Sequence, residues 1–228
     1  MSNEERKRTP TKEKYAKLIL FWKRTKLFSL IDSLISQYYR RRIKNDNFTI
    51  LCSNCVGGIL YHRLGKKFLT PTINMWIPQP DFVEFCVHLD YYLAQDPQFI
   101  ESNQSFPVGQ LIGDGENIPS ITLNFNHDKV AEEARAKWNE RKKRIVRDNM
   151  YIMMYKLDGV TVEQLKRLEN VPCRNKVVFT AKPLPAIPWS VCIKPIMTHR
   201  DPYNYLEKDM FGVRYLEKKF DYISFLNS

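Results

Sequence analysis

The stretch Thr49-Ile-Leu-Cys-Ser-Asn-Cys-Val-Gly-Gly58 decides the fold class of this chain. It begins as a short apolar strand, passes through a small polar turn and reaches two glycines where a helix starts. In open α/β folds this order leaves backbone N–H groups facing a ligand at the carboxyl end of the strand. The sequence therefore predicts a donor- or phosphate-binding site at these residues: Ser53, Asn54, Cys55, Gly57 and Gly58.

The turn carries no complete phosphate-binding motif. Neither G-x-G-x-x-G nor a P-loop sequence occurs in it, so a turn that only packs the helix remains the alternative. Cys52 and Cys55 form an isolated CxxC pair without the second pair of ligands that a zinc site needs. We therefore expect no metal and no cofactor, with the donor bound as a substrate.

The composition is that of a globular chain in a reducing compartment. Hydrophobic residues make up 43% of the 228 residues, which is enough for one good-sized domain. The five cysteines are an odd number at irregular spacing, which argues against a disulfide framework. Neither a membrane-spanning apolar run nor a signal peptide is seen, so we expect a cytoplasmic protein.

The positive charge is concentrated at the N-terminus. Residues 1–44 hold 13 of the 36 Lys and Arg residues and 4 of the 25 Asp and Glu residues, a balance of +9 out of +11. Apolar residues recur at helical spacing over residues 12–43, which predicts a basic amphipathic helix. We expect residues 1–44 to form this appendage and residues 45–228 to form a single α/β domain.

A basic amphipathic helix of this kind has three interpretations. It suits an anionic membrane surface, and it equally suits packing against the domain or a second subunit. Nucleic acid is disfavoured, because the chain shows no known nucleic-acid-binding module. We therefore expect a protein held peripherally at the inner membrane face, and a homodimer remains open.

Further elements follow the glycine turn in order. Residues 73–77 read as a second strand, and residues 81–93 read as a helix with Asp81 as its N-cap. Residues 95–119 are rich in loop residues, and residues 121–125 alternate as a strand.

His127 stands at the end of that last strand. It is the best general-base candidate among the four histidines, with a loop or capping role as the alternative. A helix starting near Asp128 then carries Arg141 and Arg144, one turn apart. Their guanidinium groups are suited to a diphosphate, although a solvated face is the usual role of such a charge run.

The clearest structural signal is a βαβ unit. Residues 150–155 and 176–180 are apolar strands, and residues 161–168 form a short helix between them, which predicts a parallel sheet. Asn149 precedes the first strand, and Asp158 follows it in an Asp-Gly turn. Asp158 is thus at the ligand-binding end of the sheet, although a turn role is its usual one. Beyond these strands, the sequence predicts an edge strand at 189–193 and two short C-terminal helices at 203–225.

These segments occur in the order of a known family. The matching segments are Leu51-Cys-Ser-Asn-Cys-Val-Gly-Gly-Ile-Leu-Tyr61, Thr70-Pro71-Thr72, Pro107-Val-Gly109, Phe125-Asn-His127, Trp138, Arg141, Arg144-Ile145, Asp148-Asn149 and Lys176-Val-Val-Phe-Thr180. Over about residues 46–183 the chain resembles the bacterial domain of unknown function numbered 1919, and residues 184–228 form a C-terminal extension. Members are commonly labelled exopolysaccharide or capsular polysaccharide biosynthesis proteins. They often carry Asn-Cys-Trp-Gly-Gly, and Val56 replaces that Trp here.

Together these lines predict a three-layer, Rossmann-like α/β fold and a transferase of surface-polysaccharide assembly. A nucleotide-sugar donor would lie on the glycine turn with Arg141 and Arg144 at its phosphates, and His127 would take a proton from a polysaccharide or lipid-linked acceptor. The alternatives are an acyl- or phosphoryl-transferase acting on the same polysaccharide, and a non-catalytic assembly partner.

Overall fold

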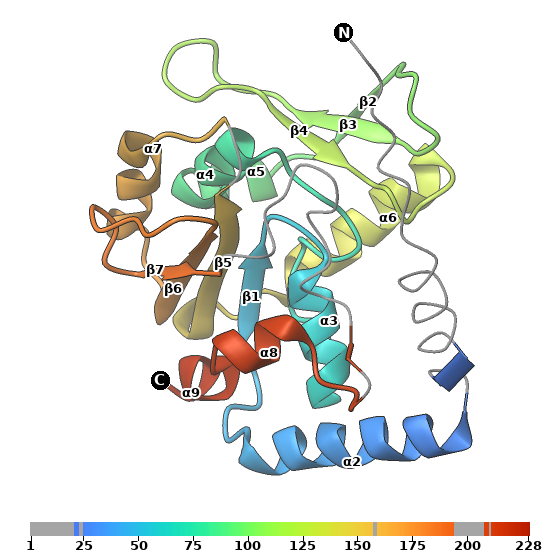
Figure 1. The fold of residues 1–228 in the computed structure, drawn as a ribbon. Helices are drawn as coiled ribbons and strands as arrows, with labels where there is room; N and C mark the ends of the chain where they lie inside the picture. The colour runs from blue at the N-terminus through green and yellow to red at the C-terminus, as the bar shows by residue number, and fades with distance from the viewer. Residues whose placement is uncertain (1–20, 23–24, 157–158, 194–207, 210) are drawn as a thin grey trace, which may run out of the picture.

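The computed structural model describes residues 21–22, 25–156, 159–193, 208–209 and 211–228 (Figure 1). At its centre is a four-stranded sheet in which every pair of neighbours is parallel. Its strands, in spatial order, are β1 (Thr49–Cys52), β5 (Met150–Lys156), β6 (Asn175–Thr180) and β7 (Ser190–Cys192). The predicted parallel βαβ unit and the edge position of the last strand are confirmed.

Helices cover both faces of this sheet, so the predicted three-layer α/β architecture is confirmed. Along β5, Ile152 and Met154 face one hydrophobic cluster and Tyr151 and Met153 face the other, as the strand period of two requires. The first cluster includes α4 (Gln79–Val87), α5 (Leu89–Leu93), α6 (Ala131–Arg141) and α7 (Val162–Arg167). The second includes α3 (Val56–Leu64), α8 (Tyr215–Lys219) and α9 (Tyr222–Asn227).

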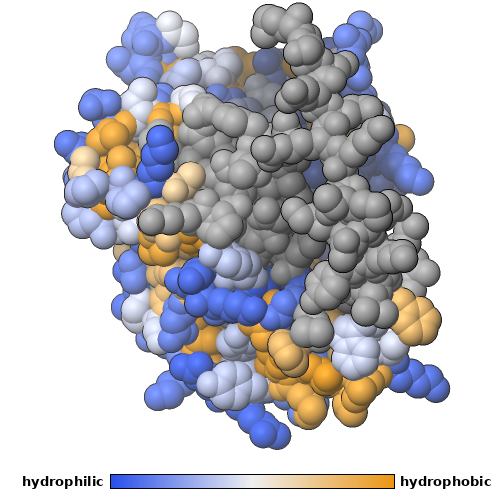
Figure 2. Space-filling model, viewed as in Figure 1, coloured by the Kyte–Doolittle hydropathy of each residue, from blue (hydrophilic) through white to orange (hydrophobic). Residues whose placement is uncertain are grey.

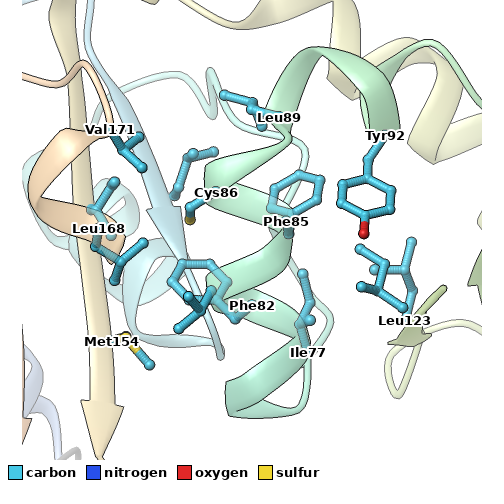
Figure 3. Packing of buried hydrophobic residues seen from close by; sticks show 14 of the residues in the cluster. Ile77, Phe82, Phe85, Cys86, Leu89, Tyr92, Leu123, Met154, Leu168 and Val171 are labelled. Atoms are coloured by element: carbon cyan, nitrogen blue, oxygen red, sulfur yellow. The ribbon is translucent and has the colours of Figure 1, made fainter. Parts of the chain in front are cut away.

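Figure 3 shows how α4 fills the space on the first face. Phe82 and Cys86 point from this helix toward Met154 of β5 and toward Leu168, which follows α7. The predicted C-terminal pair of helices is also present as α8 and α9, and both pack back on the sheet. The short 3₁₀ helices are η1 (Lys142–Arg144), η2 (Arg147–Asn149) and η3 (Leu168–Asn170).

A separate antiparallel sheet contains β2 (Gln98–Ile100), β3 (Val108–Leu111) and β4 (Ile121–Asn124). The strand predicted at 121–125 is therefore confirmed, but it does not belong to the parallel sheet. The loop-rich segment 95–119 holds the other two strands, which were not predicted. Both are short, which leaves little room for a period-two pattern.

The strand predicted at 73–77 is wrong. This segment makes a single antiparallel bridge, between Trp76 and Asn124, because Asn74 adopts a left-handed conformation (φ 57°) that interrupts the extended chain. The N–H of Ile77 also donates to the carbonyl oxygen of Ser53 at 3.0 Å. The segment therefore joins the end of β1 to the end of β4 and brings the two sheets together.

The helix predicted at 81–93 is interrupted, and its predicted N-cap is wrong. His88 (φ −112°, ψ 38°) separates α4 from α5. The helix begins at Gln79, directly after Pro78, and the carboxylate of Asp81 instead accepts the backbone N–H of Thr122 at 2.8 Å. Asp81 thus ties α4 to β4 rather than capping its own helix.

The outer edge of β1 is closed by side chains. The N–H of Ile50 donates to the hydroxyl of Tyr61 at 3.0 Å, and the N–H of Cys52 donates to the hydroxyl of Thr72 at 3.0 Å. Edge strands with free backbone groups invite wrong pairing, and buried N–H groups without partners are costly. Thr72 therefore has a structural role at this edge.

The predicted N-terminal helix is described in its second half, as α2 (Lys26–Arg42), and residues 12–20, 23 and 24 lie outside the described residues. One side of α2 packs against α3, where Arg63 meets Asp32, and against α9, where the Tyr39 and Tyr222 rings lie 5.2 Å apart. Across the described ranges, each helix is too short or too polar to traverse a lipid bilayer.

Candidate functional site

The carboxyl end of β1 forms the polar turn that the sequence predicts. Ser53 is buried, and the side-chain oxygen of Asn54 accepts the backbone N–H of Val56 at 3.1 Å. Helix α3 then begins at Val56, with Cys55 in the capping position. Asn54 thus takes up the first amide of α3, and the half-buried Cys55 side chain makes no capping hydrogen bond to the helix.

Cys55 is in contact with His127. The thiol sulfur of Cys55 lies 3.4 Å from Nε2 of the exposed His127 ring. The two residues reach this contact from different sheets, since Cys55 follows β1 and His127 follows β4. Within the described ranges, the second ring nitrogen of His127 has no hydrogen-bond partner. Among the residues that the structure describes, the arrangement is therefore a pair of side chains and not a catalytic triad.

Burial raises the pKa of the Cys55 thiol above its ordinary value, and a hydrogen bond with the Asn126 side chain partly offsets this. A raised pKa leaves the sulfur less thiolate than an ordinary cysteine has, so the sulfur needs a base in order to attack. An imidazole nitrogen in contact with a thiol at the start of a helix is the arrangement that activates cysteine nucleophiles. The site thus has the chemistry for covalent group transfer.

The two glycines are used for close packing. A Cβ placed on Gly57 would lie 3.1 Å from the Cβ of Cys52, and one on Gly58 would lie 3.0 Å from Cδ1 of Ile73. Both contacts are tighter than ordinary Cβ contacts. The packing alternative therefore accounts for both glycines, because a larger residue at Gly57 would press on Cys52 of β1 and one at Gly58 would force the Ile73 side chain to shift.

Arg141 reaches this same corner of the molecule. Its Nη1 donates to the carbonyl oxygen of Ile73 at 2.9 Å, and Ile73 is the residue that packs on Gly58. Burial lowers the pKa of Arg141, while the nearby Asp128 carboxylate acts in the opposite direction. Arg144 instead pairs with Glu140 one turn earlier. The structure thus brings Arg141 next to the glycine turn, whereas Arg144 is held along its own helix.

Two buried polar groups near His127 were not singled out from the sequence. The Asp128 carboxylate pairs with Lys137 through one oxygen, and its other oxygen has no hydrogen-bond partner in the described part of the chain. The side-chain nitrogen of Asn124, at the end of β4, is likewise buried without a partner there. The only available signal was a cluster of polar residues directly after an apolar strand.

The remaining candidates do not join this site. Asn149 lies at the amino end of β5, where its side-chain nitrogen donates to the Asn45 side chain at 2.6 Å and to the Asn47 carbonyl at 2.7 Å. It is therefore at the opposite end of the parallel sheet from Cys55. Asp158 lies outside the described residues. Across the residues that can be described, no three His, Cys, Asp or Glu side chains gather in a way that could hold a metal ion.

Comparison with known proteins places the chain in a family. A family model described as a domain of unknown function, DUF1919, matches residues 27–227. A protein of Haemophilus influenzae, described as an uncharacterized protein, is 31% identical over 193 residues, which cover 85% of this chain and 90% of that protein. The family match is longer than the resemblance seen from motifs alone, since it includes almost all of α2 as well as α8 and α9.

Proposed function

This chain belongs to the DUF1919 family, and we propose that it is a group-transfer enzyme that moves an acyl group from a thioester donor to a hydroxyl of a surface polysaccharide. The observation that carries the proposal is the 3.4 Å contact between the Cys55 sulfur and Nε2 of His127. Of the transferase classes that fit this chain, acyl transfer is the one that makes use of both side chains.

The proposed reaction has two steps. In the first, His127 takes the proton of the Cys55 thiol while the sulfur attacks the donor carbonyl, and the donor thiol leaves with that proton. In the second, His127 takes the proton of an acceptor hydroxyl while the hydroxyl oxygen attacks the acyl carbon on Cys55. The bond from that carbon to sulfur breaks, the ester leaves, and the sulfur takes the proton back from His127. General-base assistance by a positioned imidazole typically accelerates such steps by about 10²–10⁴-fold.

The fold supports the charge that develops in the first step. Cys55 occupies the capping position of α3, a helix of nine residues. The amino end of a helix carries a partial positive charge, which stabilises a thiolate relative to a thiol. This effect opposes the cost of burial that raises the pKa of Cys55.

A polysaccharide acceptor rests on the resemblance carried by the sequence motifs and not on the geometry. That resemblance implies a role in exopolysaccharide or capsular polysaccharide biosynthesis, whereas the matched family is described only as a domain of unknown function. Hydroxyl groups are the abundant nucleophiles of such polymers, and an acyl ester on one of them is the product that the proposed site would make.

Sugar transfer from a nucleotide-activated donor is the second candidate. It is favoured by Arg141, whose guanidinium is held next to the glycine turn through Ile73. There it can stabilise the diphosphate of a leaving group without a metal ion. His127 would then deprotonate the acceptor hydroxyl directly, and the Cys55 sulfur would have no part in the reaction.

A donor panel separates the two candidates. Purified full-length protein is heated in the presence of coenzyme A, acetyl coenzyme A, uridine diphosphate or UDP-glucose, because a ligand of the folded state raises the melting temperature. A shift with the coenzyme A compounds, together with acyl transfer that is lost in Cys55→Ala, supports acyl transfer. A shift with the uridine compounds, together with sugar transfer that survives in Cys55→Ala, supports the second candidate.

A further inference from the structure

Helix α2 keeps an apolar stripe exposed although its other side is docked. The stripe, here called the outer stripe, is formed by Leu27, Leu30, Leu34 and Tyr38, whose exposed fractions are 53%, 57%, 55% and 55%. Spacings of three and four residues place them on one side of the helix. Figure 2 shows apolar residues gathered along the lower edge of the molecule, where Figure 1 places α2.

The orientation of the stripe is fixed by the opposite side of the helix. Phe28 is buried, Asp32 pairs with Arg63 of α3, and the Tyr39 ring packs on the Tyr222 ring. These contacts prevent α2 from rotating to bury the outer stripe against its own domain. The stripe therefore faces outward as a permanent feature of the described structure.

Positive charge stands at both ends of the outer stripe. Lys26 precedes Leu30 by one helical turn, and Arg41 follows Tyr38 by three residues, so both lie beside the stripe and both are exposed. The one acidic residue of α2, Asp32, is turned toward Arg63 and Lys208. The exposed side of α2 thus combines four large apolar side chains with cations and no acid.

We propose that the outer stripe binds the surface of an anionic lipid bilayer, with α2 lying in the plane of the interface. The four apolar side chains would enter the boundary between headgroups and acyl chains, and Lys26 and Arg41 would contact lipid phosphates. This inference is independent of the reaction at Cys55.

The charge pattern favours lipid over a second copy of this chain. If two α2 helices paired through the outer stripe in parallel, Lys26 would face Lys26 and Arg41 would face Arg41. In the antiparallel arrangement Lys26 would face Arg41, so like charges meet in both cases, which destabilises the pairing. An anionic surface instead attracts both ends of the stripe.

Binding in this way would leave the candidate site open. The chain passes from the end of α2 into the amino end of β1, so α2 lies across the end of the sheet opposite Cys55 (Figure 1). The carboxyl end of β1 would then point away from the bilayer. A donor could enter from solvent while the protein stays on the membrane.

Vesicle co-sedimentation tests the proposal. Full-length protein is mixed with vesicles of phosphatidylcholine alone or of phosphatidylcholine with phosphatidylserine. One variant combines Leu30→Ser with Leu34→Ser, and a second combines Lys26→Glu with Arg41→Glu. The control combines Lys143→Glu with Lys166→Glu, two exposed lysines outside α2 that give the same change in net charge.

We expect the wild type and the control to bind the anionic vesicles and each α2 variant to bind them at least about tenfold more weakly, since each basic residue near the surface contributes about 1 kcal/mol. Circular dichroism checks that the variants remain folded. Equal binding by the α2 variants and the wild type would overturn the proposal. So would a dimer in solution that Leu30→Ser with Leu34→Ser abolishes, because the stripe would then be an interface between copies.

Discussion

Nη2 of Arg63 lies 3.0 Å from Oε2 of Glu217, and the two side chains are only 2% and 1% exposed. The same guanidinium binds Asp32 of α2 and donates to the carbonyl oxygen of Gly212 at 2.7 Å. One buried cation therefore connects three segments that are far apart in the sequence: α2, α3 and the stretch that ends in α8. The helix that begins at the glycine turn is held in place from its far end by these contacts.

Replacing Arg63 with Ala should destabilise the protein strongly. The change removes one of the two cations that meet the buried Glu217 carboxylate, the other being Arg214, and breaking a buried ion pair typically costs about 3–5 kcal/mol. Urea unfolding of the wild type and the variant measures the difference. The control is Arg63→Lys, which keeps a cation beside Glu217 and should lose less stability than Arg63→Ala. An Arg63→Ala variant as stable as the wild type would contradict this account of the ion pair.

The contribution of Asp32 to stability should be lost at low pH. Burial alone would raise the pKa of Asp32, but hydrogen bonds and charge attraction from Lys208 and Arg63 outweigh it and lower the pKa below its ordinary value. The stabilising contribution is therefore present above the ordinary carboxyl pKa and is lost as the pH falls through the lowered one.

Unfolding free energies of the wild type and Asp32→Asn, measured across the acidic range, test this sign. The free energy of unfolding of the wild type should exceed that of the variant by a constant amount near neutral pH. This difference should shrink as the pH falls below the ordinary pKa of Asp. An advantage that grows on acidification would contradict the direction of the shift.

The sequence was informative where local pattern determines structure. The apolar runs of β1, β5 and β6 and the short helix between the last two strands were predicted correctly, since strand length and helix capping are local properties. The contact between Cys55 and His127 was not predictable. It depends on the 73–77 segment, whose single bridge at Trp76 joins the two sheets, and no local periodicity encodes such a bridge.

The glycine pair shows a different limit. A small residue at a turn is compatible with both ligand approach and close packing, and only the positions of Cys52 and Ile73 reveal the packing role. Arg141 and Arg144 were likewise predicted as a pair by their spacing. Their actual partners, Ile73 and Glu140, separate them.

Replacing Thr72 with Val should weaken the edge of β1. Val has nearly the same shape but cannot accept the N–H of Cys52, and a buried donor without a partner costs about 1–3 kcal/mol. Thermal or urea unfolding measures the loss, and Thr72→Ser, which keeps the hydroxyl, serves as the control. A Val variant as stable as the Ser variant would show that the hydroxyl is not needed at this edge.

Alkylation of Cys55 should require alkaline conditions in the free protein. Burial raises the pKa of this thiol, so the midpoint of its reaction with iodoacetamide should lie above that of an ordinary cysteine. Peptide mass spectrometry over a pH series gives the rate at Cys55 separately from the other four cysteines. Cys52 and Cys86 serve as internal controls, since both are buried and should remain unmodified in the folded protein. Full reactivity of Cys55 at neutral pH would contradict the raised pKa.

The most direct test of the central claim is to trap the acyl group on the protein. Full-length protein is mixed with acetyl coenzyme A without an acceptor, quenched in acid and analysed by intact-mass and peptide mass spectrometry. The account predicts one acetyl group on the wild-type protein, at Cys55, and no acetylated protein with Cys55→Ala. It also predicts that the acetyl group forms on Cys55 about 10²–10⁴-fold more slowly in His127→Ala. An unmodified Cys55 under conditions in which the protein transfers acetyl groups to an acceptor would contradict it.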